Sequence, residues 1–171
     1  MRNSSRSPRR AITALAAVAC AAAMTLATPN LALAHDAKPK RLVLYSQNTS
    51  LDLVDGSKPG TDHGDLFHRT LTLSRTLGGP VIGTGYTQGE VIFHDNSRDI
   101  RRVMLQAFLP KGNLFLVGTS DLPLGALPEP GWTNTYAIIG GTGRYAGAVG
   151  TMTAVLLPDG KSFKNTLTYR Q

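Results

Sequence analysis

The sequence has a single cysteine, Cys20, and only 6% aromatic residues among its 171 residues. Cys20 lies in an apolar N-terminal stretch, so the rest of the chain offers no disulfide framework and no thiol nucleophile. No segment of useful length has apolar residues at the 3.6-residue spacing of an amphipathic helix. A G-x-S-x-G nucleophile motif is also absent, which argues against Ser-His-Asp hydrolysis. A folded domain of this chain must therefore rely on a core built from strands.

Acidic residues are the minority, with 11 Asp and Glu against 18 Lys and Arg. The excess is concentrated at the N-terminus, because four arginines and no acidic residue lie in residues 1–34. The formal charge therefore falls from +7 for the whole chain to +3 for the remainder. Outside that segment no basic run is longer than Arg101-Arg102. We therefore expect no nucleic-acid partner.

Residues 1–34 have the order of a signal peptide. Arg9-Arg10 precedes an apolar stretch, and residues 32–34 form an A-x-A cleavage site that would leave His35 as the new N-terminus. The apolar stretch is short for a membrane span and no stop-transfer pattern follows, so we expect no membrane span after processing. The prediction is a secreted protein. The general secretory route is favoured, and a twin-arginine route is the alternative.

The remainder reads as one all-β domain over residues 41–171, after a polar segment, residues 35–40, that we expect to be disordered. Segments 48–64 and 122–132 are rich in Gly, Pro, Asp or Ser and are predicted to be loops. Eight strand candidates must bury their faces and edges in a barrel or a sandwich, and the pattern alone leaves both open. The candidates are residues 41–47, 65–75, 81–94, 100–109, 114–120, 134–139, 148–157 and 162–170.

Glycines interrupt the long strand candidate at residues 81–94. Gly83, Gly85 and Gly89 share one parity within it. Glycines inside a strand pattern are typical of bulges or barrel corners. A bulge would change which face of the strand points inward, so the orientation of its later side chains stays open.

Residues 138–150 form a glycine-rich segment with a G-x-G-x-x-A match at Gly141, Gly143 and Ala146. A dinucleotide site would need a following helix and a βαβ unit of about 30 residues. A Thr-rich strand pattern follows instead, and the chain is nearly finished. We predict a tight glycine turn in which Tyr145 packs back as a plug between two strands.

The same segment resembles the G-G-T-G-x-F/Y-x-x-A-x-G stretch shared by plant dirigent proteins and allene oxide cyclases. Residues 63–67, 83–95 and 42–45 resemble further strand motifs of these proteins, in the same order. The resemblance implies a secreted bacterial relative with an eight-stranded antiparallel barrel and an apolar lumen, often trimeric. Such a barrel steers the cyclisation or coupling of a hydrophobic ligand.

The chain departs from these families after the tyrosine of the first strand. There the cyclases carry a glutamate and an asparagine, and the dirigent proteins carry a His-Asp pair. This chain has Ser46-Gln47-Asn48, so only Asn48 matches the cyclase pattern. A carboxylate that could move a proton is missing in either comparison. The fold can persist without the reaction of its relatives.

Glu90 and His94 are the candidate catalytic residues. By the period of two along a strand they share a face, which would make them an acid–base pair if that face lines the lumen. A strand face that carries Gln88, Glu90 and His94 is more commonly a solvated outer face than a lumen face.

Further polar and aromatic residues are candidate ligand-binding residues because they occur on strand faces that could line the lumen, where an arginine or an amide could orient a carbonyl or carboxylate. Solvation of the barrel rim is the commoner alternative. The candidates are Tyr45, Asn48, Asp65, Arg69, Tyr86, Arg102 and Gln106.

The metal-like cluster of the sequence is Asp62, His63, Asp65 and His68. Such residues suit zinc, but at a loop that enters a strand they commonly only solvate a turn. We therefore predict neither a metal nor another cofactor.

Two classes of function remain. The first is an isomerase-like cyclase or dirigent protein that acts mainly by confining a small hydrophobic intermediate. The second is a non-catalytic barrel, either a carrier of a lipophilic ligand or an extracellular interaction protein.

Overall fold

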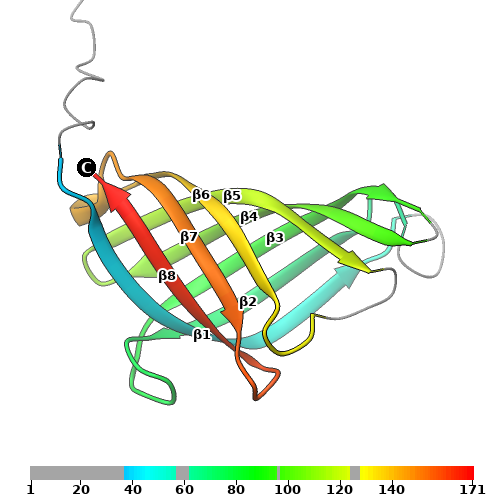
Figure 1. The fold of residues 1–171 in the computed structure, drawn as a ribbon, viewed down its shortest axis with the longest axis horizontal. Helices are drawn as coiled ribbons and strands as arrows, with labels where there is room; N and C mark the ends of the chain where they lie inside the picture. The colour runs from blue at the N-terminus through cyan, green and yellow to red at the C-terminus, as the bar shows by residue number, and fades with distance from the viewer. Residues whose placement is uncertain (1–36, 57–61, 96, 124–127) are drawn as a thin grey trace, which may run out of the picture. The chain divides into compact units, whose positions relative to one another are not determined.

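The computed structural model describes residues 37–56, 62–95, 97–123 and 128–171. Eight antiparallel strands follow one another in chain order and close into a barrel, with β8 paired to β1 (Figure 1). This confirms the predicted fold class and decides between the barrel and the sandwich. The predicted leader, residues 1–34, lies outside the described residues, as do His35 and Asp36. The strands are β1 (Lys40–Val54), β2 (Leu66–Ser74), β3 (Val81–His94), β4 (Arg98–Leu109), β5 (Gly112–Pro123), β6 (Thr133–Gly141), β7 (Val149–Leu156) and β8 (Ser162–Arg170).

The core lies inside the barrel because apolar side chains alternate with exposed ones along each strand. On β7, for example, Met152, Ala154 and Leu156 are buried, whereas Thr151 between β6 and β8 is exposed. Leu114 and Leu167 are among the most deeply buried side chains. The inward faces of all strands together form one closed apolar wall.

Strand β1 is longer than predicted, because it continues to Val54 through a segment predicted to be a loop. It pairs with β8 only as far as Gln47 and with β2 from Tyr45 to Val54. A register shift between Asn48 and Ser50 leaves Thr49 as an extra residue. Sequence alone missed this extension because its exposed residues show no alternating pattern of burial.

Strand β3 contains register shifts, but they do not fall on its glycines. The extra residues are Ile82, opposite the step from Leu73 to Ser74 in β2, and Ile92, opposite β4. Gly89 instead makes room for a large neighbour, because a Cβ atom there would overlap the Phe67 ring. The glycines of this strand therefore serve packing, whereas the bulges reorient the chain.

One end of the barrel is closed by the connection between β6 and β7. Here the three-residue 3-10 helix η1 (Gly143–Tyr145) follows a turn in which Gly143 has a φ of +57°. Tyr145 is buried and its ring contacts Tyr169 edge to face, with 6.0 Å between the ring centroids. The predicted tyrosine plug is therefore present. In the described ranges, no helix is long and apolar enough to cross a membrane.

The opposite end carries the connections β1–β2, β3–β4, β5–β6 and β7–β8, as antiparallel order requires. Strands β5 and β6 pair only between Leu114 and Val117 on the β5 side, near the plugged end. Their other halves are held by fewer backbone contacts, and Asn134 donates a side-chain hydrogen bond to the Thr119 carbonyl there. We call this end the loop end.

Candidate functional site

The barrel encloses a cavity, named here the lumen cavity, which is lined by inward-facing residues of the strands together with Pro128 and Trp132 from the β5–β6 connection. Its volume is about 100 Å³, measured as the space open to the centres of water-sized molecules. This exceeds severalfold the space of about 10–15 Å³ that one water needs on this measure. The apolar part of the wall consists of Leu44, Phe67, Leu71, Leu73, Val103, Leu105, Ala107, Leu116, Leu122, Met152, Ala154, Phe163 and Leu167.

A neutral hydrogen-bonded pair occupies the wall where the cyclase pattern has its glutamate. Ser46 on β1 is buried, and Asn165 on β8 donates a hydrogen bond of 3.0 Å from its side-chain nitrogen to the Ser46 hydroxyl. Both residues line the lumen cavity. The wall position that would carry a carboxylate in a cyclase is therefore neutral.

Two arginines bring positive charge into this wall, Arg69 from β2 and Arg101 from β4. Both contact the ring of Phe67, with their guanidinium carbons 5.1 and 5.7 Å from its centroid. Arg101 pairs with the fully buried Asp99 at 3.1 Å. Burial lowers the pKa of Arg69, as does the positive charge of Arg101, but an arginine still keeps its proton at neutral pH.

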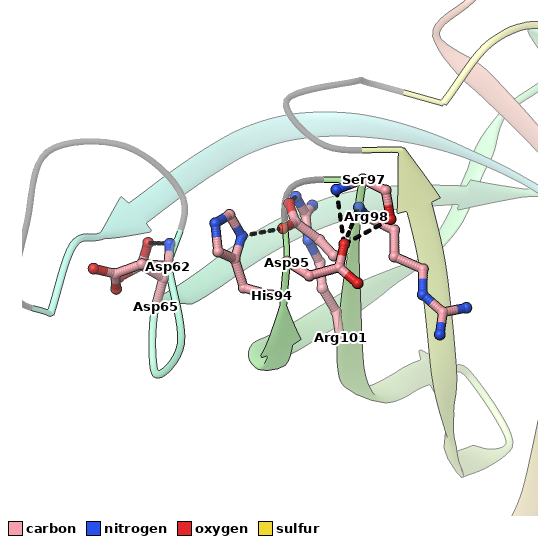
Figure 2. Close-up of polar contacts among 8 residues, drawn as sticks. Asp62, Asp65, His94, Asp95, Ser97, Arg98 and Arg101 are labelled. Atoms are coloured by element: carbon pink, nitrogen blue, oxygen red, sulfur yellow. Dashed lines mark hydrogen bonds and ion pairs between the residues drawn. The ribbon is translucent and has the colours of Figure 1, made fainter.

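His94 joins this charged group near the loop end (Figure 2). Its Nδ1 lies 2.7 Å from Asp99 Oδ1, while Asp99 Oδ2 accepts from Arg101. The His94 side chain is 29% exposed and Asp99 is fully buried. Asp99 thus connects an imidazole that solvent can reach to an arginine in the cavity wall.

Tyr136 adds a hydroxyl to the same wall. Burial raises the pKa of Tyr136, and this outweighs the lowering by Asn134, Arg69 and Ser120. The phenol therefore stays protonated through the neutral range and can donate a hydrogen bond.

The structure does not bring Glu90 and His94 onto one face. The extra residue Ile92 between them changes the parity of β3, so Glu90 is opposite the exposed Arg102 whereas His94 is opposite the buried Asp99. Glu90 forms an ion pair with Arg102 on the outer face. The shared face expected from the period of two is therefore wrong, although the catalytic roles themselves stay predictions.

Four of the predicted ligand-binding residues border the lumen cavity, namely Asn48, Arg69, Tyr86 and Gln106. The side chains of Tyr86 and Gln106 are exposed, and the buried Thr87 next to Tyr86 marks the inward parity. Arg69 is therefore the predicted residue that combines a charge with a place inside the barrel. The sequence put Arg69 on one strand face with Phe67 and left open whether that face lines the lumen.

The other three predicted ligand-binding residues lie outside the lumen cavity. Tyr45 borders a separate hollow near the β2–β3 turn. Arg102 pairs with Glu90 on the outer face. Asp65 accepts backbone hydrogen bonds from Gly56 and Asp62 and so ties together the two ends of the β1–β2 connection (Figure 2).

Sequence reasoning missed four residues of this site: Asp99, Arg101, Trp132 and Tyr136. A signal existed for Asp99 and Arg101, because they share the parity of Val103 and so place two charges on an otherwise apolar face. Trp132 lies in a segment predicted to be a loop, where no place in the barrel could be expected. For Tyr136 the sequence shows only its place in a strand candidate, which does not indicate a functional role.

The metal-like cluster of the sequence is dispersed. Asp62 and Asp65 take part in the loop hydrogen bonds, whereas His63 and His68 are exposed. Across the residues that the structure describes, no three His, Cys, Asp or Glu side chains gather as a possible metal site.

No protein-family model and no curated protein sequence matches this chain. Solved structures do match it. A pyocyanin demethylase superposes with a TM-score of 0.62 at 25% identity, over 76% of this chain and 99% of that one. A nonspecific heme-binding cyclase that catalyses a cycloaddition during neoabyssomicin biosynthesis gives 0.64 at 21% identity, over 82% and 70%. A pterocarpan synthase dirigent protein gives 0.63 at 14% identity, over 84% and 94%.

The class defined by the fold and the cavity is the closed eight-stranded barrel with a ligand-sized lumen. Solved structures with this fold include a demethylase, a cyclase and a dirigent protein, so the chain has the barrel fold that the sequence resemblance predicted. The relatives differ in reaction, and the fold alone does not choose among them.

Proposed function

We propose that this chain is a secreted barrel that binds a small, largely apolar molecule in its lumen cavity and steers the cyclisation or coupling of that molecule. The observation that carries the proposal is the closed apolar wall with a few convergent polar groups, which is the composition of a ligand pocket. The relatives support it, because one is a cyclase and another a pterocarpan synthase.

The chemistry of such a barrel would come from confinement rather than from strong acids and bases. The described lining of the lumen cavity includes no Asp or Glu, and the cyclase glutamate is replaced by the Ser46–Asn165 pair. A rigid apolar wall can hold a flexible substrate in one reactive conformation, which lowers the entropy cost of ring closure or coupling. Tyr136 can orient an oxygen of the substrate.

His94 is the proposed proton-transfer group where the reaction needs one. Asp99 contacts its Nδ1 and so orients the ring, an arrangement that suits a proton-transfer group. Glu90 is a weaker candidate for proton transfer, because it forms an ion pair with Arg102 on the outer face.

A coupling assay with matched variants tests the proposal. A 4-propenylphenol, oxidised to its radical by an added one-electron oxidant, couples to racemic dimers in free solution. A linear polyene with a reactive diene and alkene serves as the cyclisation probe. Enrichment of one stereoisomer by the protein, measured by chiral chromatography, supports steering. Racemic or uncatalysed product with every probe contradicts it.

Two substitutions to phenylalanine separate the lumen from the surface. Ala154→Phe places a ring in the lumen cavity, whereas Ala137→Phe places the same ring on an exposed position of β6. Stereoselectivity should be lost in the first variant and kept in the second. Equal effects of the two would argue against the lumen as the reaction site.

The alternative is a non-catalytic carrier, favoured by the lack of carboxylates in the described lining. Extraction of the purified protein with organic solvent, followed by mass spectrometry, distinguishes the two. A single lipophilic compound that rebinds and is released unchanged identifies a carrier.

Secretion is part of the proposal and rests on the leader in the sequence. Expression of the full chain in a bacterial host should give extracytoplasmic protein that begins at His35, read by N-terminal sequencing. Intact chain retained in the cytoplasm would contradict export.

A further inference from the structure

The wall of the lumen cavity carries positive charge that its own residues do not balance. Arg69 and Arg101 line it, and the described lining has no carboxylate. Asp99 pairs with Arg101 from outside the lining, but no ion pair joins Arg69 to any described residue. Among the described residues, Arg69 therefore has no counter-ion.

Hydrogen-bond donors on both arginines are also unused. The Nε atoms of Arg69 and Arg101 are buried, and the described residues give neither of them an acceptor. A buried donor without a partner costs free energy, and more so when it is charged. A protein can retain such a donor where a bound ligand satisfies it.

We propose that Arg69 receives an anionic oxygen group of the ligand, a carboxylate or the oxygen of an enolate or phenolate, while the apolar body of the ligand occupies the lumen cavity. This inference rests on the proposed function and names the chemical class of its ligand. A guanidinium matches a planar oxyanion with two parallel hydrogen bonds, which a neutral group cannot reproduce.

The surroundings of Arg69 fix its position for this role. Its guanidinium carbon lies 5.1 Å from the centroid of the Phe67 ring, which Arg101 also contacts at 5.7 Å. The repulsion from Arg101 and the desolvation of Arg69 would both be relieved by a bound anion. Tyr136, whose hydroxyl remains protonated, supplies a second donor in the same wall. Among the described residues, the other ionisable groups close to this cluster are Asp99 and His94, and Asp99 contacts both His94 and Arg101.

The cavity also contains its own reporter. Trp132 is the single tryptophan of the chain and borders the lumen cavity, where it packs edge to face on Phe163 with 6.5 Å between ring centroids. Its fluorescence should change when a ligand enters the barrel. Aromatic acids without absorption at the excitation wavelength of tryptophan are suitable probes.

The experiment compares acids with their neutral amides of almost equal shape. The pairs are phenylacetate with phenylacetamide, 3-phenylpropanoate with 3-phenylpropanamide, and 4-phenylbutanoate with 4-phenylbutanamide. Binding is measured at neutral pH by Trp132 fluorescence and by calorimetry. We expect at least one acid to bind about tenfold to a hundredfold more tightly than its amide, the range of a charge-assisted hydrogen bond.

Three variants assign that preference to Arg69. Arg69→Met removes the charge and keeps the length, so the acid should bind no better than the amide. Arg69→Lys keeps the charge and should retain part of the preference. Arg41→Met makes the same change on an exposed position of β1 and should bind as the wild type does. Circular dichroism and thermal melting verify that each variant is folded.

The outcomes separate the two proposals. Equal binding of acid and amide by the wild type overturns the anion site and leaves the apolar lumen as a ligand site. A preference that survives in Arg69→Met overturns the assignment to Arg69. If no acid and no amide binds at millimolar concentration, lumen binding itself is contradicted, and the proposed function fails with it. The wild-type comparison holds even if a variant does not fold.

Discussion

At the scale of single residues, the buried Asp99 is the most constrained charge among the described residues. It is fully buried and accepts from Arg101 on one oxygen and contacts His94 with the other. Removing one partner of a buried ion pair leaves a charge that burial strongly disfavours, whereas exposed pairs contribute little. The chain contains both kinds of Arg–Asp pair, which permits a direct comparison.

We predict that Arg101→Met lowers the free energy of unfolding by about 3 kcal/mol, because among the described residues the buried Asp99 then keeps only its contact with His94. Arg98→Met breaks the exposed pair with Asp121 and should cost at most about 0.5 kcal/mol. Urea unfolding followed by circular dichroism measures both. Similar losses in the two variants would show that burial of the first pair does not matter.

Asp65 gives a prediction on pH. Backbone hydrogen bonds from Gly56 and Asp62 lower its pKa below the ordinary value of 3.8. A carboxyl group with a lowered folded-state pKa contributes stability that is fully present above its unfolded pKa. That contribution is lost as the pH falls from about 3.8 through the lowered value.

In Asp65→Asn, the melting temperature should therefore fall less steeply with acidification below pH 3.8 than in the wild type. Asp95 and Asp159, whose pKa values are lowered by neighbouring hydrogen bonds, keep part of the acid sensitivity in both proteins. The measurement is a series of melting curves at decreasing pH. Parallel curves for the two proteins would exclude a role of Asp65 in acid unfolding.

At the scale of elements, the positions of strands and turns could be predicted from the sequence, but the direction in which the side chains of a strand point could not always be predicted. The bounds of β3 and β8 were predicted as the structure has them, because turn residues flank both. The parity of the end of β3 could not be predicted, since the extra residue Ile92 looks like any other strand residue. The face of His94 depends on that one residue, so the shared face with Glu90 was predicted wrongly.

In the candidate site, too, features within one strand could be predicted and contacts between strands could not. The shared face of Arg69 and Phe67 could be predicted, because β2 is a regular strand, but whether that face points inward stayed open. The contact of Asp99 with His94 could not be foreseen, because it depends on pairing between β3 and β4 beyond a bulge. Local pattern predicts which face a residue shares within one strand, but contacts between strands also need the register.

The glycine turn between β6 and β7 offers a test of the plugged end. A Cβ atom on Gly141 would overlap the backbone oxygen of Tyr145 and approach that of Asn113 to 2.6 Å, whereas one on Gly140 would meet nothing within 4 Å. Backbone atoms cannot move aside cheaply. We predict that Gly141→Ala costs about 2–3 kcal/mol, the upper range for overpacking, and that Gly140→Ala changes stability by less than about 0.5 kcal/mol. Chemical unfolding of the two neighbouring variants measures the difference. Equal stability of the two would mean that Tyr145 does not need this close turn.

At the scale of the whole molecule, closure of the barrel limits how copies of the chain can associate. The strands pair in a complete circuit, and β5 and β6 lack ladder pairs only in their halves nearer the loop end, so little sheet edge is open to a strand from another copy. We therefore expect an oligomer to use mainly the outer side chains. Several large apolar side chains are exposed there, among them Tyr86 and Phe108, whose rings lie edge to face on neighbouring strands, and Met104.

The resemblance to dirigent proteins and allene oxide cyclases implies a homotrimer, and we predict one for the secreted chain. Light scattering coupled to size-exclusion chromatography at micromolar concentration should give three times the mass of the chain from residue 35.

If outer apolar side chains form the contact, added salt should leave the trimer intact, because salt screens charges and does not weaken apolar burial. A monomer under these conditions would contradict the prediction. A trimer that dissociates as salt is raised would instead assign the contact to charged side chains. Neither result would alter the assignment of the lumen cavity, because residues from every strand of the barrel, β1 to β8, line it.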